Sequence, residues 1–218
     1  CETSFNFSKD NLGVRWRIHT GIDWVFQQAG EAIILEDDCL ADPTFFRFCG
    51  ELLARYRDDS RVMHISGNCY VQRPSTPSYY LSRFALIWGW ATWKRAWSLY
   101  DGNLKQWDDP QKRGEFLRTF KTGAERRFWT DALNGVQAGT LLTWDYQWLF
   151  TILLNRGLCI NPTRNLVKNI GFGADASHTF ESTDWLDRLQ LQSVTFTLSH
   201  PETLSVDDAA DNIVARLH

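Results

Sequence analysis

The order of apolar and polar positions in the first third of the chain predicts a strand, a helix and a second strand. Residues 32–35, Ala-Ile-Ile-Leu, are aliphatic without alternation, as in a short strand buried on both faces. Asp42 and Pro43 are a favourable N-cap and first residue for a helix, and apolar residues recur every three or four positions over 43–58. The run 61–67 predicts a second strand. A strand, a crossover helix and a strand are the unit of a parallel sheet.

The rest of the pattern predicts helices around that sheet. Thr20 is the expected cap of one helix, and another helix is expected from Thr92 onward. The segment 143–157 is apolar almost all round, as in a buried helix. Shorter elements are loops over 68–80 and 169–180, helical pieces within 101–143, and a strand over 158–162. We therefore expect one α/β domain over residues 1–218, in which 184–218 is a tail with little pattern.

Composition narrows the classes of function. The chain has 218 residues, 44% hydrophobic and 22% charged, which suits a globular protein with one substantial core. A formal net charge of -3 argues against a nucleic-acid partner, because such proteins usually carry a strongly basic face. No apolar run approaches the roughly 20 residues of a membrane span, so we expect no transmembrane segment. The five cysteines lack metal-ligand spacing, which favours reduced thiols and a cytoplasmic protein, with a place at the membrane periphery left open.

Three consecutive carboxylates, Glu36, Asp37 and Asp38, directly follow the first predicted strand. Ligands of open parallel sheets bind outside the carboxyl ends of the strands, so this position suits a site. Adjacent residues of an extended segment point opposite ways, so Asp37 and Asp38 face one ion only if the chain turns there. Carboxylate oxygens suit Mg²⁺ or Mn²⁺, which bind through one or two carboxylates plus substrate phosphates. The alternative is an acidic strand end in water.

Four patches occur in an order that resembles a known family. They are, in chain order, ILEDDCLADPTFFRF, LIWGWATWKRAW, TWDYQWL and NRGLCINPTRNLVKNIGFGADASHTF. This order resembles the GT-A glycosyltransferases related to N-acetylglucosaminyltransferase I. Its texture is similar to bacterial nucleotide-diphospho-sugar transferase-like, or hemolytic-protein-like, sequences. The resemblance implies a Rossmann-like GT-A fold, with a mostly parallel sheet flanked by helices.

The resemblance also implies a reaction, the metal-dependent transfer of a sugar from a nucleotide-diphosphate donor to an acceptor hydroxyl. Asp38 matches the direct ligand of Mn²⁺ or Mg²⁺, with Glu36 and Asp37 nearer the donor sugar and ribose. Asp145 matches the catalytic base of an inverting reaction, and Tyr146 stands where the related enzyme has a second acid. Asp145 also opens a predicted helix, whose N-terminal dipole favours a charged carboxylate. The alternative is that Asp145 only caps this helix.

Further candidates lie in the other patches. Glycine lets a backbone approach a ligand, Trp stacks on sugars, and a His after a glycine-rich loop can reach a metal or diphosphate. The donor-side candidates are Trp88, Gly89, Trp90 and His178. The acceptor-side candidates are Asn68, Trp144 and Trp148. Arg15 and Arg17 are weaker candidates for the diphosphate. For each of them a structural reading stays open, as a core Trp, a packed His or a surface Arg.

The chain is short at its beginning for a GT-A enzyme. Only 35 residues precede Glu36, and they show no initial strand, so we expect the first nucleotide-binding strand to be missing. One alternative function is a non-catalytic remnant that binds carbohydrate or a protein partner. Another is a Mg²⁺-dependent phosphohydrolase, which should bring further Asp and His ligands at strand ends. The expected partners are a nucleotide-sugar donor and a carbohydrate or glycoconjugate acceptor; the sequence determines neither their identity nor the oligomeric state.

Overall fold

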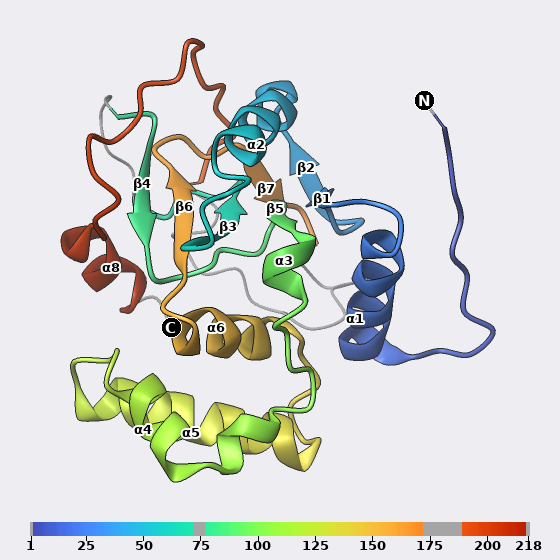
Figure 1. Cartoon of the computed structure of the whole chain (residues 1–218), viewed down its shortest axis with the longest axis vertical. Helices are drawn as coiled ribbons and strands as arrows, with labels where there is room; N and C mark the ends of the chain where they lie inside the picture. Colours follow the sequence, from blue (N-terminus) through green and yellow to red (C-terminus); the bar gives the residue numbers. More distant parts are fainter. Residues whose placement is uncertain (1, 72–76, 172–188, 217–218) are drawn as a thin grey trace. The chain divides into compact units, whose positions relative to one another are not determined.

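The computed structural model describes residues 2–71, 77–171 and 189–216 (Figure 1). By their contacts the residues divide into two compact units, each built from two stretches of the chain. Unit 1 combines Cys1–Ala32 with Lys94–Arg156, and unit 2 combines Ile33–Trp93 with Gly157–His218. The expectation of a single domain stays a prediction, which this division does not test. In the described ranges, no helix is both long enough and apolar enough to cross a membrane.

Unit 1 is helical. Its elements are α1 (Gly13–Phe26), α3 (Lys94–Trp97), the 3₁₀ helix η1 (Lys105–Asp108), α4 (Pro110–Leu117), α5 (Gly123–Ala138) and α6 (Asp145–Leu154). Helices α4, α5 and α6 lie against one another (Figure 1). The buried ring of Phe116 joins them, with its centroid 5.9 Å from that of Trp129 and 5.2 Å from that of Phe150. The predicted buried helix and the helical pieces before it are therefore confirmed.

Two predicted helix starts were wrong. The first helix begins at Gly13 rather than at Thr20, and the Thr20 hydroxyl instead donates to the Trp16 carbonyl, 2.7 Å away, within the helix. Residues from Thr92 onward are not simply a helix, because Thr92 lies in a strand and its hydroxyl donates to the Met63 carbonyl at 2.7 Å. The sequence Trp-Ala-Thr-Trp is aromatic and β-branched, which suits a buried strand.

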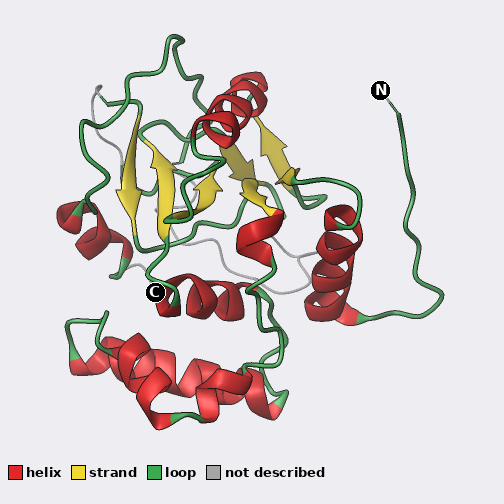
Figure 2. Ribbon diagram, in the orientation of Figure 1, coloured by secondary structure: helices red, strands yellow, loops and turns green. Residues whose placement is uncertain are grey.

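Unit 2 holds the strands, drawn in yellow in Figure 2. Its elements are β1 (Glu31–Ile34), which begins in unit 1, β2 (Cys39–Ala41), α2 (Pro43–Arg55), β3 (Val62–Ser66), β4 (Tyr79–Ser82), β5 (Trp90–Trp93), β6 (Leu158–Pro162), β7 (Val167–Asn169) and α8 (Asp208–Val214). The predicted strands at 32–35, 61–67 and 158–162 are thus confirmed. The α/β class is confirmed as well.

The sheet is mixed rather than mostly parallel. Within the described residues, five strands follow the order β1-β5-β3-β6-β4. Strand β3 runs parallel to β6 but antiparallel to β5, and β4 runs antiparallel to β6. The expected mostly parallel sheet was therefore wrong. The reason is that β4 and β5 come from segments read as a loop and a helix start, and β5 lies between β1 and β3, the two strands of the expected parallel unit.

Helix α2 begins and packs as its sequence predicts. The Asp42 carboxylate accepts from the Thr44 N–H at 2.8 Å, which caps the first turn, and Pro43 follows at the first helical position. The buried face of the helix consists of Phe45, Phe48, Cys49, Leu52 and Leu53. These side chains form one apolar core with residues of β3, β4, β5 and β6, over one face of the sheet (Figure 1).

The low-information tail holds helix α8, which is tied to β4 by a buried carboxylate. Asp211 is 4% exposed and accepts from the Ser82 hydroxyl at 2.6 Å and from Arg83 Nη1 at 3.0 Å. The same Nη1 donates to Asp208 at 2.8 Å. No periodic sequence pattern predicts this contact, because it joins a carboxylate and a guanidinium that are 128 residues apart in the chain.

Replacing Arg83 by Met is expected to lower the free energy of unfolding by about 2–3 kcal/mol, because it leaves a buried carboxylate without its cation. Urea unfolding at pH 7 measures this change. The matched control is Arg61→Met, whose guanidinium is exposed and paired with Asp59 at the surface, so its loss is expected to change stability much less. Equal effects of the two substitutions would contradict the anchoring role of Arg83.

Candidate functional site

The carboxylate triplet forms a tight turn between β1 and β2. The Cys39 N–H donates to the Glu36 carbonyl at 3.1 Å, so Asp37 and Asp38 are the two central residues of the turn. Glu36 and Asp38 are half-buried, whereas Asp37 is exposed. The chain therefore does turn at the triplet, which was the condition for carboxylates here to face a common ligand.

The pKa of the Cys39 thiol is affected by burial and by the carboxylates of this turn. Burial is the largest cause that raises the pKa of Cys39 to about 12, and the negative charges of Asp38 and Glu36 raise it further. Hydrogen bonding to the backbone of Glu36 and Gly89 opposes these effects. Asp38 Oδ1 lies 3.7 Å from this sulfur atom, and in the part of the chain that the structure describes no Lys or Arg is paired with Asp38.

The Asp38 carboxylate is held from the neighbouring strand. Strand β2 pairs antiparallel with β7, with Cys39 opposite Asn169. Asn169 Nδ2 donates to Asp38 Oδ2 at 3.0 Å, and the N–H of Ile170 donates to the Asp38 carbonyl at 2.8 Å. A Cβ atom on Gly171 would lie 2.5 Å from Asp38 Oδ2, so only glycine fits there without displacing the carboxylate. Sequence reasoning missed Asn169; its only signal was a polar residue directly before the glycine-rich loop.

The segment with Trp88 and Gly89 lies beside the same turn. Gly89 has a φ of +64°, and a Cβ there would lie 2.7 Å from Val167 and 3.0 Å from Leu35. Its carbonyl accepts from the Gly67 N–H at 2.7 Å. The close approach that glycine permits is thus to neighbouring side chains of unit 2. Three patches of the sequence, the triplet, the Trp-Gly-Trp loop and β7, therefore meet in one place.

Asn68 and Trp90 have mainly internal contacts. Asn68 is fully buried, its Oδ1 accepts from the Trp88 N–H at 2.9 Å, and its Nδ2 donates to the Val167 carbonyl at 3.0 Å. It therefore braces the loop of Trp88 against β7. Trp90 is fully buried in β5 and stacks on His64, with ring centroids 5.0 Å apart. The position of Trp90 agrees with the reading of a core Trp that was kept open for it.

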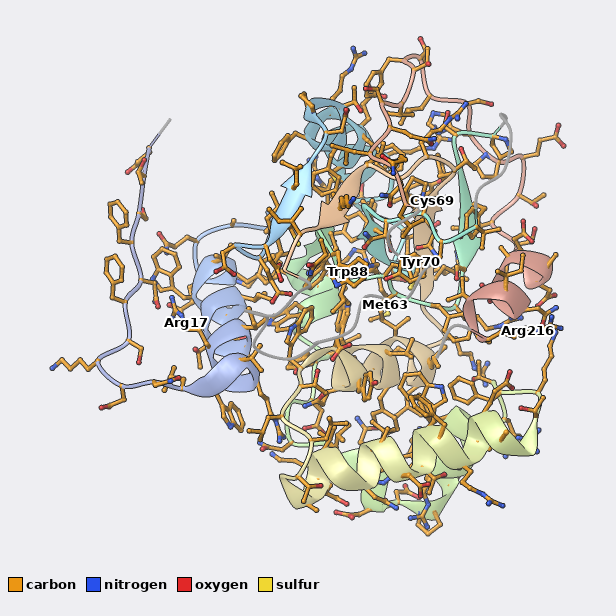
Figure 3. All side chains as sticks on the ribbon, turned by 180° about the vertical axis from the view of Figure 1, so that it is seen from behind. Arg17, Met63, Cys69, Tyr70, Trp88 and Arg216 are labelled. Atoms are coloured by element: carbon orange, nitrogen blue, oxygen red, sulfur yellow. The ribbon has the colours of Figure 1, made fainter. Side chains whose placement is uncertain are left out.

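An aromatic pair that sequence reasoning did not single out stands next to Asn68. Tyr70 and Trp88 are both half-buried, and their ring centroids are 5.9 Å apart (Figure 3). Such a pair presents apolar ring surface with polar edges, which suits a sugar ring. The spacing in sequence gives no hint of it, since Tyr70 follows β3 and Trp88 precedes β5.

Asp145 is the first residue of α6 in unit 1. Its N-cap is Trp144, which makes no side-chain capping bond, so Asp145 is not the N-cap that the alternative reading required. The Thr143 hydroxyl donates to Asp145 Oδ1. Burial raises the pKa of Asp145, although this hydroxyl and the N–H groups of Asp145 and Tyr146 act in the opposite direction. A half-buried carboxylate with a raised pKa has the property expected of a general base.

The two tryptophans around Asp145 are packed within unit 1. Trp144 and Trp148 are 2% and 0% exposed, and the ring centroids of Trp148 and Trp97 are 5.2 Å apart. The Tyr100 hydroxyl donates to the Trp144 carbonyl at 3.0 Å, and its ring stacks on Trp97 at 4.3 Å. These contacts pack the first turn of α6, which includes Asp145, against buried aromatic side chains of unit 1.

The remaining candidates are placed as follows. In unit 1 Arg15 donates to the carbonyls of Val136 and Gly102, and Arg17 donates to Asn6. Both guanidinium groups therefore make hydrogen bonds within the protein. His178 lies outside the described residues.

A divalent cation fits the donor set of the triplet turn. Asp38 and Glu36 belong to one turn, and their carboxylates supply hard oxygen atoms of the kind that Mg²⁺ and Mn²⁺ bind. Among the described residues no three His, Cys, Asp or Glu side chains gather into a complete metal site. Mg²⁺ and Mn²⁺ commonly take their other ligands from substrate phosphates and water. The turn is therefore suited to a metal that arrives with a phosphorylated ligand.

The motif order is the basis of the resemblance stated for the sequence. No family model matches the chain, and no curated protein matches it either.

Proposed function

We propose that the chain is a metal-dependent glycosyltransferase that moves a sugar from a nucleotide-diphosphate donor to an acceptor hydroxyl with inversion. The observation that carries the proposal is the triplet turn, where Asp38 has no paired cation among the described residues and is held in place by Asn169. A carboxylate in this setting favours binding of a cation. The second support is the order of the sequence motifs, which resembles that of GT-A enzymes. We also propose that the α/β fold is of the GT-A type.

The residues divide the chemistry as follows. Asp38, with Glu36 beside it, would hold Mn²⁺ or Mg²⁺, which supplies positive charge for the departing diphosphate. Asp145 takes the proton of the acceptor hydroxyl while the acceptor oxygen attacks the anomeric carbon of the donor sugar. The bond from that carbon to the diphosphate breaks, and its electron pair leaves with the diphosphate. Tyr70 and Trp88 offer ring surface for a sugar.

The proposal predicts metal-dependent binding of a nucleotide sugar that requires Asp38. Calorimetry with UDP-, GDP- and CDP-sugars, with and without Mn²⁺, is expected to show binding for the wild type and a loss of at least about tenfold in affinity for Asp38→Ala. The matched control is Asp58→Ala, an exposed carboxylate of unit 2, which should bind as the wild type does. Release of nucleoside diphosphate in the presence of glycans then tests transfer.

Two results would overturn the proposal. The first is the absence of metal-dependent heat with any of the three donor classes. The second is glycan binding that survives in Asp38→Ala without any transfer by the wild type, which would favour a non-catalytic carbohydrate-binding protein. Release of inorganic phosphate from phosphate esters would instead favour a phosphohydrolase.

A further inference from the structure

The carboxylate of Asp38 is held by Asn169, the last residue of β7, and lies against Gly171, two residues further along the chain. Asn169 Nδ2 donates to Asp38 Oδ2 at 3.0 Å, and Asn169 Oδ1 accepts from the Gly171 N–H at 2.7 Å. The two bonds together determine how the amide is oriented, because its oxygen already accepts from a main-chain donor. Its NH₂ group must therefore face the carboxylate. We call this arrangement the Asp38–Asn169–Gly171 clasp.

The clasp treats the two oxygen atoms of Asp38 differently. Oδ2 receives the amide and lies against Gly171, where a Cβ atom would approach to 2.5 Å. Among the contacts of the described residues, Oδ1 has only a weak one, from the thiol of Cys39, whose Sγ is 3.7 Å away. A hydrogen bond to one carboxylate oxygen orients the group so that the other oxygen is presented to a ligand.

We propose that Asn169 is a positioning residue, which holds Asp38 by Oδ2 so that Oδ1 is presented to a divalent cation, and that Gly171 is required because any side chain there displaces the carboxylate. This inference rests on the proposed function, since it takes Asp38 as the metal ligand. It goes further by assigning a metal-ordering role to two residues that lie more than 130 positions along the chain from Asp38.

The test measures affinity for Mn²⁺ alone on the full 218-residue chain. By calorimetry, Asn169→Leu is expected to bind Mn²⁺ about 10- to 100-fold more weakly than the wild type, the usual effect of removing a hydrogen bond to a metal ligand. Asn169→Ser keeps a donor and is expected to fall between the two. Gly171→Ala is expected to weaken binding at least as much as Asn169→Leu, because its Cβ pushes directly on Asp38.

Two control variants separate positioning from folding. Gly50→Ala adds a Cβ in unit 2 where no atom lies within 4 Å. Leu40→Ala truncates an exposed side chain on β2, the strand that pairs with β7. Both are expected to bind Mn²⁺ as the wild type does. Without metal, the melting temperature of Asn169→Leu should fall no further than that of Leu40→Ala, while the rise that Mn²⁺ induces in the wild type should be lost.

The outcomes distinguish this inference from the proposed function. If Asp38→Ala loses Mn²⁺ while Asn169→Leu and Gly171→Ala keep wild-type affinity, the clasp is wrong and the metal site stands. If the wild type itself binds no Mn²⁺, both the clasp and the metal role of Asp38 are overturned. If Asn169→Leu lowers the metal-free melting temperature well beyond Leu40→Ala, and its Mn²⁺ affinity falls only as far as its folded fraction does, its role is structural and the inference fails.

Discussion

Replacing Asp145 by Asn is expected to lower the rate of sugar transfer by about 10²- to 10⁴-fold, the usual contribution of a general base. The amide has nearly the same shape and keeps an acceptor for the Thr143 hydroxyl, but it cannot take a proton. Binding of the nucleotide sugar with Mn²⁺ should be unchanged, because Asp145 acts on the acceptor. The rate is measured as nucleoside diphosphate released with a glycan acceptor, and calorimetry measures the binding.

The same substitution should leave the protein at least as stable as the wild type. Burial raises the folded pKa of Asp145 above its unfolded value, so the folded state holds this proton more firmly. For such a group the stabilisation is present below the unfolded pKa and is lost as the pH rises through the folded pKa. At neutral pH the ionised carboxylate therefore costs stability, and a neutral amide removes that cost.

The control is Asp131→Asn, an exposed position on α5 of the same unit, which should alter neither rate nor stability. A wild-type rate for Asp145→Asn would remove Asp145 as the base. A large loss of stability without loss of rate would assign it to the helix start instead.

Acidification is expected to destabilise the protein through His64, by about 1.4 kcal/mol for each pH unit below 6.5. His64 is fully buried in β3, and burial lowers its pKa to about 3, against the smaller opposing effect of the Leu86 carbonyl. The ring is neutral, and its Nε2 lies 3.1 Å from that carbonyl, to which the Nε2–H tautomer donates. Protonation would place a charge between this strand and Trp90, on which the ring stacks.

The sign follows from proton uptake. Between pH 6.5 and about 3 the unfolded chain binds a proton at His64 and the folded chain does not. Stability is therefore complete above pH 6.5 and falls as the pH falls through this window. Urea unfolding between pH 6.5 and 5 should show a loss of about 2 kcal/mol from this residue, before most carboxylates titrate.

The variant His64→Gln keeps an N–H donor for the Leu86 carbonyl and removes the titration, so its stability should depend less on pH in this window. His200→Gln is the control, because His200 is only half-buried; its pKa is also lowered by burial, and its effect should have the same sign and be smaller. Equal pH dependence in wild type and His64→Gln would contradict the assignment.

Local patterns sufficed for several parts of the structure. The aliphatic run before Glu36, the Asp-Pro start of α2 and the nearly continuous apolar segment of α6 each specify an element through residues close in sequence. Such signals depend on period and capping, which neighbouring residues determine by themselves. The same signals put the triplet at a strand end, where the structure has it.

Local patterns failed where a strand was short or was stabilised by distant partners. The start of strand β4 was read as a loop, and β5 as the start of a helix, because both strands are buried along their whole length and so show no alternation, and neither has the aliphatic run that marks β1. Their insertion changed a mostly parallel sheet into a mixed one. Helix α8 was missed for a related reason, since its anchor on Arg83 is a contact between distant residues.

The sequence by itself therefore determined the chemical groups of the candidate site: the carboxylates of the triplet, Asp145 at a helix start, and the Trp-Gly-Trp loop. Only the tertiary structure decided how the groups of unit 2 are arranged. The turn at Glu36–Cys39 separates Asp37 from its two neighbours, and the register of β2 with β7 brings Asn169 to Asp38. Strand register depends on packing between segments far apart in the chain, which no local pattern encodes.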